Sequence, residues 1–118
     1  MEKRHHPRFP ARFQSSFTSV NRISGEGEVV DLSLRGCRLE CAQSVRPGST
    51  ISLRIHVLPD DPPLNVNEAI VRWVRAGTCG VEFTSLAPDE WARLQHSVTQ
   101  LELHPYQQSD ADQAAEAA

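Results

Sequence analysis

The sequence has no long apolar run, few cysteines and few aromatic residues, and each shortage excludes a class of protein. No segment reaches the roughly 20 apolar residues of a membrane-spanning helix, and the charged start lacks the apolar stretch of a signal peptide. The three cysteines are odd in number and form no Cys-x-x-Cys pair, which argues against a disulfide framework or a zinc site. Aromatic residues make up 6% of the chain, too few for the stacking groove of a protein that binds single-stranded nucleic acid. We therefore expect a soluble, cytoplasmic protein without a membrane span.

The charge of the chain is unevenly distributed. Asp110, Asp112 and Glu116 account for the net charge of −3, so residues 1–109 are neutral. Basic residues crowd the opposite end of the chain, at Lys3, Arg4, Arg8 and Arg12. A neutral body with a short basic arm neutralises few phosphates, which suits a small anionic ligand and not a long polyanion. We therefore expect no nucleic acid polymer as a partner.

Six segments have the pattern of β-strands. From Ile51 to Val57 apolar and polar residues alternate, which is the period of a strand with one buried face. In residues 64–75 apolar side chains fall on both faces, so this strand is either buried on both sides or bent. The predicted strands are residues 11–20, 28–32, 37–41, 51–57, 64–75 and 79–83. Turn residues at 24–27 and 47–48 separate them, which favours an all-β fold, a small six-stranded antiparallel β-barrel.

The apolar period changes near the C-terminus. Apolar residues recur at helical spacing from Trp91 to Leu101, Pro88 suits the first turn of a helix, and Pro105 ends it. We predict a C-terminal helix over about residues 88–103 that packs its apolar stripe, Trp91 included, on the barrel. The predicted domains are a flexible basic arm at 1–10, the barrel with its helix at 11–104 and a disordered acidic tail at 105–118.

The connection between the second and third predicted strands carries the first candidate site residues. It reads Asp31-Leu32-Ser33-Leu34-Arg35-Gly36. Asp31 and Ser33 make hydrogen bonds at turns, and Gly36 permits a positive φ or a close approach of the backbone. The connection therefore presents a carboxylate, a hydroxyl and bare backbone at the edge of a sheet. A role in capping the turn is compatible with a role in binding.

Arg4 and Arg8 supply positive charge, in contrast to the carboxylate of Asp31. A guanidinium grips phosphate with two hydrogen bonds, pairs with the O6/N7 edge of guanine, or stacks on a purine face. Pro7 and Pro10 keep the arm extended or turned instead of helical. Two such arginines suit a ligand that carries both phosphates and purines, and the alternative is a solvated basic terminus.

The two motifs together resemble the PilZ domain family. Arg-x-x-x-Arg at Arg4 and Arg8 is followed by Asp-x-Ser-x-x-Gly at 31–36 and by Gly-Val-Glu-Phe at 80–83 before a helix, so the resemblance covers residues 3–103. It implies a six-stranded antiparallel barrel with a C-terminal helix, and a bacterial receptor for cyclic diguanylate (cyclic di-GMP). Similar single-domain proteins suggest control of motility, pili, exopolysaccharide or biofilm through an unidentified effector protein. We expect no cofactor beyond this ligand and no metal.

The resemblance assigns ligand-binding roles to both motifs. Arg4 and Arg8 are expected to bind phosphate and the O6/N7 edge of guanine. Asp31 is expected to accept hydrogen bonds from the N1–H and N2–H₂ groups of guanine. Ser33 would add a hydroxyl contact, and Gly36 would let the backbone come close without a Cβ clash.

Two further residues complete the candidate site. Lys3 adds a cation beside Arg4 that would favour an intercalated dimer of the ligand over a monomer. Trp73 stacks on a base if it faces the mouth of the barrel, and packs in the core if it points inward.

Our interpretation is a receptor without enzymatic activity. The arm at residues 1–10 has little apolar content, so we expect it to close over the ligand and to present a changed surface to a partner protein. The sequence contains neither a nucleophile elbow nor a phosphate-binding loop, so we expect no catalysis. The alternative is a PilZ-like barrel that serves as a protein-interaction module without nucleotide binding. Such a barrel would be expected to lack the two motifs, and both are present here.

Overall fold

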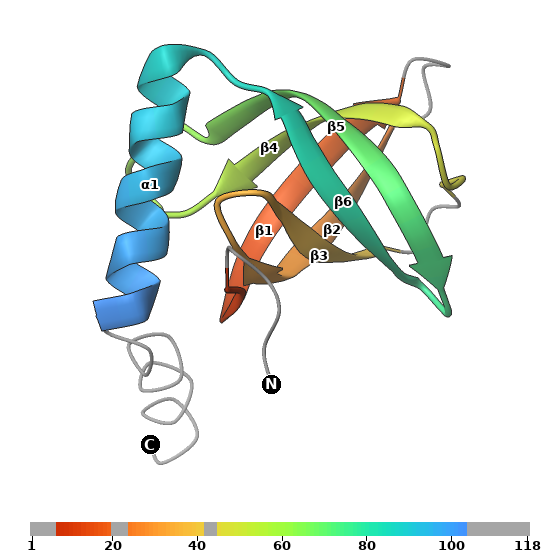
Figure 1. Ribbon diagram of the computed structural model, residues 1–118, viewed down its shortest axis with the longest axis horizontal. Helices are drawn as coiled ribbons and strands as arrows, with labels where there is room; N and C mark the ends of the chain where they lie inside the picture. The colour runs from red at the N-terminus through yellow and green to blue at the C-terminus, as the bar shows by residue number, and fades with distance from the viewer. Residues whose placement is uncertain (1–6, 20–23, 42–44, 104–118) are drawn as a thin grey trace.

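The computed structural model describes residues 7–19, 24–41 and 45–103, which form a closed β-barrel and one helix (Figure 1). The strands are β1 (Phe9–Ser19), β2 (Ser24–Leu32), β3 (Gly36–Cys41), β4 (Thr50–His56), β5 (Leu64–Arg75) and β6 (Thr78–Ser85). The helix is α1 (Pro88–Leu103). The strand order is β1-β2-β3-β6-β5-β4, and every neighbouring pair is antiparallel. The predicted fold class is confirmed.

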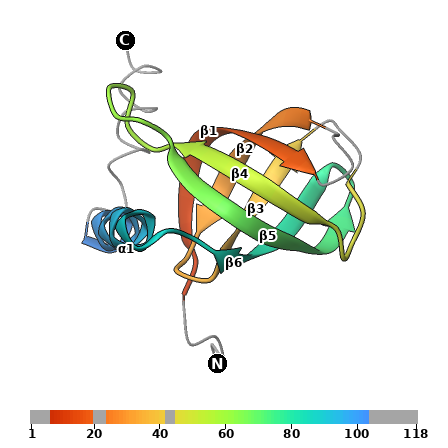
Figure 2. The ribbon, with the colours of Figure 1, turned by 90° about the horizontal axis from the view of Figure 1, so that it is seen from above.

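The core lies inside the barrel. Ile51, Leu53 and Ile55 of β4 point inward and are at most 1% exposed, as their alternation predicted. Each such side chain contributes about 1.5–3 kcal/mol by leaving water. Closure of the sheet leaves no unpaired edge among these strands, which surround the core as a closed barrel (Figure 2). The outward-facing side chains of these strands form the outer wall of the barrel. Any ligand of the barrel must therefore bind on this outer wall or at its ends.

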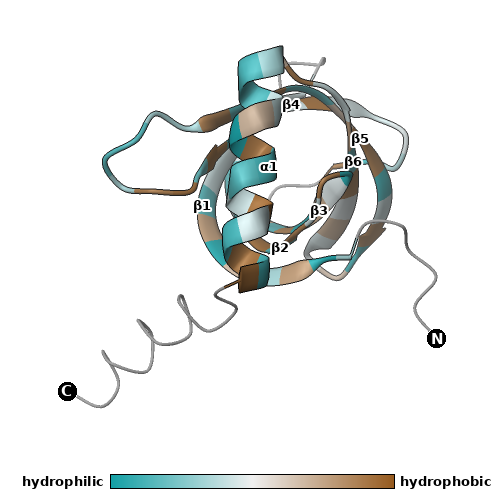
Figure 3. Cartoon of the chain, turned by 60° about the vertical axis from the view of Figure 1, so that its left-hand side comes forward, coloured by the Kyte–Doolittle hydropathy of each residue, from teal (hydrophilic) through white to brown (hydrophobic). Residues whose placement is uncertain are grey.

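The helix α1 covers one end of the barrel (Figure 3). It contacts β1 and β5, and its buried side chains are Leu94, Val98 and Leu101. Trp91 has the same helical spacing but keeps 38% of its surface exposed. The periodicity thus indicated the correct face of the helix, whereas the barrel covers that face only from the second turn onward.

Several predicted strand boundaries differ from the structure, most of all the start of β2. The turn predicted at residues 24–27 is wrong, because Gly25 pairs with Phe17 and Gly27 pairs with Cys41 in the sheet. Pairing with a strand on each side satisfies the backbone of this segment and outweighs its local preference for a turn. The strand β1 also begins earlier than predicted, at Phe9. Of the predicted flexible arm at residues 1–10, residues 1–6 lie outside the described residues, whereas Phe9 and Pro10 belong to β1. The predicted disordered tail at residues 105–118 lies entirely outside the described residues.

The strand β5 is bent, which was one of the two predicted alternatives. Its register shifts between Glu68 and Ala69 and again between Val71 and Trp73. Extra residues at such shifts redirect side chains from one face of the sheet to the other. After the bend, the strand β5 presents Trp73 on the outer wall. No helix in the described ranges is long and apolar enough to cross a membrane.

Candidate functional site

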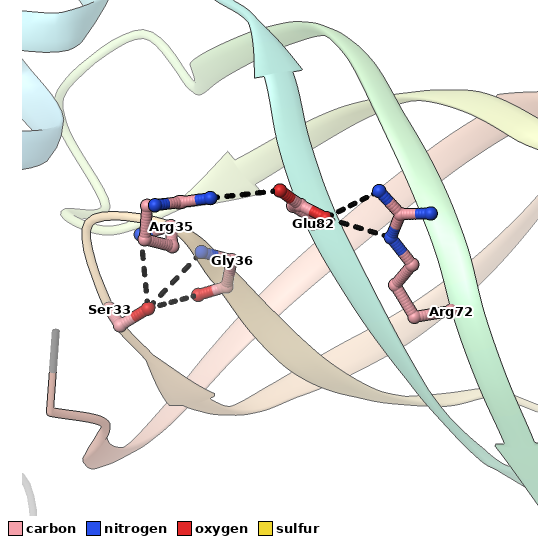
Figure 4. A network of polar contacts seen from close by, with 5 residues as sticks. All are labelled: Ser33, Arg35, Gly36, Arg72 and Glu82. Atoms are coloured by element: carbon pink, nitrogen blue, oxygen red, sulfur yellow. Dashed lines mark hydrogen bonds and ion pairs between the residues drawn. The ribbon is translucent and has the colours of Figure 1, made fainter. Parts of the chain in front are cut away.

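Ser33 organises the connection between β2 and β3 (Figure 4). Its hydroxyl accepts hydrogen bonds from the backbone N–H groups of Arg35 and Gly36, both at 3.1 Å, and donates to the Gly36 carbonyl at 3.2 Å. The backbone N–H of Ser33 donates to the same carbonyl at 2.9 Å. These bonds occupy the donor and both lone pairs of the hydroxyl. Ser33 therefore holds the turn, and its contact with a ligand stays a prediction.

Gly36 fits the connection against the neighbouring strand. It pairs with Glu82 of β6. A Cβ atom at this position would lie 3.1 Å from the carbonyl carbon of Val81 and closer still to its oxygen. Because these are backbone atoms, a side chain would push β3 and β6 apart. The close backbone approach that the sequence suggested is thus made to β6, and an approach to a ligand stays a prediction.

Asp31 and Arg38 form an ion pair on the outer wall. The backbone N–H of Arg38 donates to Oδ1 of Asp31 at 2.9 Å, and Nε of Arg38 lies 3.3 Å from Oδ2. The Asp31 side chain is 12% exposed and the Arg38 side chain 47% exposed. The carboxylate is therefore oriented by two donors of one residue, next to a guanidinium that reaches the solvent.

Trp73 lies on the same outer wall. Strand pairing forms a row that crosses four strands in the order Asp31, Arg38, Gly80 and Trp73. The indole covers Gly80, since a Cβ at Gly80 would lie 2.9 Å from Cδ1 of Trp73 and closer to two other indole atoms. The guanidinium of Arg75 lies 5.7 Å from the centre of the ring. Trp73 therefore does not pack in the core, and it lies on the wall instead of at the mouth of the barrel.

Arg8 lies at the start of this surface. Phe9 and Pro10 pair with Leu32 and Asp31, so the chain brings Arg8 beside the β2–β3 connection. Burial raises the pKa of the Cys37 thiol, the charge of Asp31 raises it further, and the charge of Arg8 lowers it. The charges of Asp31 and Arg8 therefore both act on the part of the barrel around Cys37. Arg4 and Lys3 lie outside the described residues, and their roles stay predictions.

A second polar group is centred on Glu82 and joins it to two arginines (Figure 4). Glu82 on β6 forms ion pairs with Arg72 at 2.6 Å and with Arg35 at 3.1 Å. Hydrogen bonds from Arg72 and then from Arg35 lower the pKa of Glu82. This group ties the β2–β3 connection, through Arg35, to β5 and β6. The described residues contain no group of three or more His, Cys, Asp or Glu side chains that could hold a metal ion.

Comparison with known proteins gives the family. A family model of the PilZ domain matches residues 2–100. The chain belongs to the PilZ domain family. No curated protein sequence matches this PilZ domain.

Solved structures of PilZ proteins share its fold. The PilZ domain of YcgR from Escherichia coli with c-di-GMP aligns with a TM-score of 0.73 and 14% identity, over 92% of this chain and 98% of that one. The PilZ domain of CeSA from a cellulose-synthesizing bacterium aligns with a TM-score of 0.65 and 18% identity, over 81% and 98%. The MrkH–c-di-GMP complex of K. pneumonia aligns with a TM-score of 0.71 and 16% identity, over 92% of this chain and 55% of that one. This PilZ domain thus spans about half of the MrkH chain.

The structure of this PilZ domain brings together most of the predicted site residues that it describes. The described members are Arg8, Asp31, Ser33, Gly36 and Trp73. Sequence reasoning missed Arg38, although the inward-facing Cys37 and Leu39 on either side of it indicate that it points outward. It also missed the ion pair of Glu82 with Arg35, because the β2–β3 connection and β6 are far apart in the chain, and the ion pair of Glu82 with Arg72 of the neighbouring strand β5.

Proposed function

We propose that this PilZ domain is a receptor for cyclic di-GMP and not an enzyme, and that it binds its ligand on the outer wall of the barrel. One observation carries the proposal. A carboxylate and an indole from distant parts of the chain, Asp31 and Trp73, lie in one row of the wall, and Arg8 lies where this surface begins. The membership of the family and the presence of c-di-GMP in the YcgR and MrkH structures support the same ligand.

Each of these groups matches one part of the ligand. Arg8, together with Arg4 of the arm, would bind the phosphodiester or the O6/N7 edge of a guanine. Asp31 would accept from N1–H and N2–H₂ of guanine. The indole of Trp73, partly exposed on its glycine, offers a flat face on which a base stacks. Ser33 and Gly36 would act by holding the β2–β3 connection that follows Asp31.

We further propose how binding becomes a signal. The arm, with Lys3 and Arg4, would close over the bound ligand because its positive charge complements the phosphates. The closed arm and ligand would form a surface that an effector protein recognises, through a shift in the population of open and closed arms. The regulated process would be one of motility, pilus function, exopolysaccharide production or biofilm formation. The ligand would bind as a monomer or as an intercalated dimer.

Calorimetric titration with cyclic di-GMP tests the receptor. A micromolar affinity corresponds to about 8 kcal/mol. Arg8→Ala should abolish measurable heat while thermal unfolding stays unchanged. Arg12→Ala is the matched control, since Arg12 lies on β1, which begins directly after Arg8, and forms an ion pair at 3.4 Å with Glu28, which is not a member of the row. The stoichiometry of the wild type separates a bound monomer from a bound dimer.

The alternative function predicts a different outcome. A protein-interaction module would show no heat with cyclic di-GMP and no ligand-induced shifts of its backbone amides in NMR. Full affinity in Arg8→Ala would equally exclude the proposed site. Under the proposal, amide shifts should gather in residues 1–10 and in the β2–β3 connection, and they should disappear in Arg8→Ala.

A further inference from the structure

Arg38 is a charged residue in the middle of the candidate site that belongs to neither sequence motif. It lies in the row between Asp31 on β2 and Gly80 on β6. Its Nε faces the Asp31 carboxylate at 3.3 Å, while 47% of its side chain is exposed. A guanidinium has further N–H donors beyond Nε. A ligand that reaches Asp31 from the solvent therefore meets donors of Arg38 beside the acceptors of Asp31.

This arrangement of donors and acceptors complements guanine. The Watson–Crick edge of guanine presents the acceptor O6 next to the donors N1–H and N2–H₂. Adenine presents an amino donor in place of O6 and an acceptor at N1, which is the reverse order. We propose that Arg38 donates to O6 of the same guanine whose N1–H and N2–H₂ groups donate to Asp31. Arg38 is then a specificity-determining residue of the receptor, an inference that rests on the proposed function.

The other arginines near the row have different surroundings. Arg35 and Arg72 are held by Glu82, and the guanidinium of Arg75 lies near the ring of Trp73. Among the residues that the structure describes, Arg38 is the arginine that forms an ion pair with Asp31, the carboxylate predicted to read the base. Neighbouring strands are about 4.8 Å apart, so Arg38 is close enough to share one base with Asp31.

The experiment compares three ligands in calorimetric titrations: cyclic di-GMP, its 6-thioguanine analogue and its inosine analogue. The thio analogue weakens the acceptor at position 6, and the inosine analogue removes the N2 amino group. In the wild type each analogue should bind at least about five-fold more weakly than cyclic di-GMP. In Arg38→Met the thio penalty should disappear. The inosine penalty should remain, because the backbone N–H of residue 38 still orients Asp31 at 2.9 Å.

Arg75→Met is the matched control, an exposed arginine on the same wall, and it should leave both penalties unchanged. If Arg38→Met weakens all three ligands equally, Arg38 only positions Asp31 and the inference is wrong. Equal binding of the thio analogue and cyclic di-GMP by the wild type would also overturn it. A wild type that binds none of the three ligands would instead overturn the proposed function, on which the inference rests. Thermal unfolding of each variant shows that the barrel is intact.

Discussion

The substitution Gly80→Ala should remove the indole from the outer wall without unfolding the barrel. The added Cβ would lie 2.9 Å from Cδ1 of Trp73 and closer to Nε1 and Cε2, so the ring must leave its position. The atoms in the way belong to a side chain on the outside of the barrel. The pairing of β5 with β6 can therefore persist while the ring swings into the solvent.

The size of the effect follows from the contact that is lost. Stacking of one base on an aromatic side chain contributes about 1–3 kcal/mol, which is about a 5- to 150-fold change in affinity. The cost to folding should be near the lower end of the range for an added methyl group, about 1 kcal/mol, because the ring can move outward. The affinity for cyclic di-GMP should thus fall while the domain remains folded.

Gly36→Ala is the matched comparison for this prediction. There the new Cβ would lie 3.1 Å from the carbonyl carbon of Val81, 3.2 Å from the Cα of Glu82 and closer still to the Val81 oxygen. Backbone atoms cannot move aside without opening the pairing of β3 with β6. We expect a loss of several kcal/mol in the free energy of unfolding, on the scale of about 4 kcal/mol for severe core defects. Calorimetry and urea unfolding of both variants give the two readouts. Full affinity in Gly80→Ala, or equal destabilisation by both substitutions, would refute the reasoning.

Three further predictions concern other parts of the barrel. Ala76 begins the β5–β6 turn with a φ of 48°, in the left-handed region that asparagine adopts more readily than alanine. Ala76→Asn should therefore raise the free energy of unfolding in urea by about 1 kcal/mol. A lower stability of this variant would contradict the prediction. Iodoacetamide at pH 8 should label Cys41 first in the native protein, because Cys37 and Cys79 are buried and burial raises the pKa of Cys79 to about 12. Intact-mass analysis checks this, and earlier labelling of a buried thiol would disprove it. The pKa of Glu82 is lowered in the folded state, so Glu82→Gln should cost a little stability above the unfolded carboxyl pKa of about 4.3. The difference in the free energy of unfolding between the wild type and Glu82→Gln should vanish as the pH falls through the pKa of Glu82 in the folded state. A constant difference between pH 7 and pH 3 would contradict a stabilising contribution of the ion pairs.

Local pattern was sufficient to predict the strands and the helix. The alternation from Ile51 to Val57 and the helical spacing from Leu94 to Leu101 both report which face meets the core. Local pattern failed at residues 24–27, where Gly25 and Gly27 read as a turn but extend β2. Glycine suits turns because of its own backbone, whereas the partners of this segment come from β1 and β3. Preferences of single residues do not contain that information.

The sequence was likewise sufficient to predict only part of the candidate site. Arg8, Asp31 and Ser33 could be associated from the sequence because β1, β2 and β3 follow one another and pair as hairpins. Trp73 and Glu82 join them only because β6 pairs with β3, which is not its neighbour in the chain. The bend of β5 then decides that the indole faces outward.

The pairing of β3 with β6 also explains why glycine is needed at two positions of the candidate site. Gly36 and Gly80 lie on these two strands, and each leaves room that another group fills: the backbone of Val81 at the first and the indole of Trp73 at the second. The first close approach joins the strands, and the second places an aromatic face beside Arg38. A barrel with the same two sequence motifs but a side chain in place of Gly80 would keep the carboxylate and the arginines and lose the stacking surface. The residue at position 80 should therefore affect affinity although it belongs to neither motif.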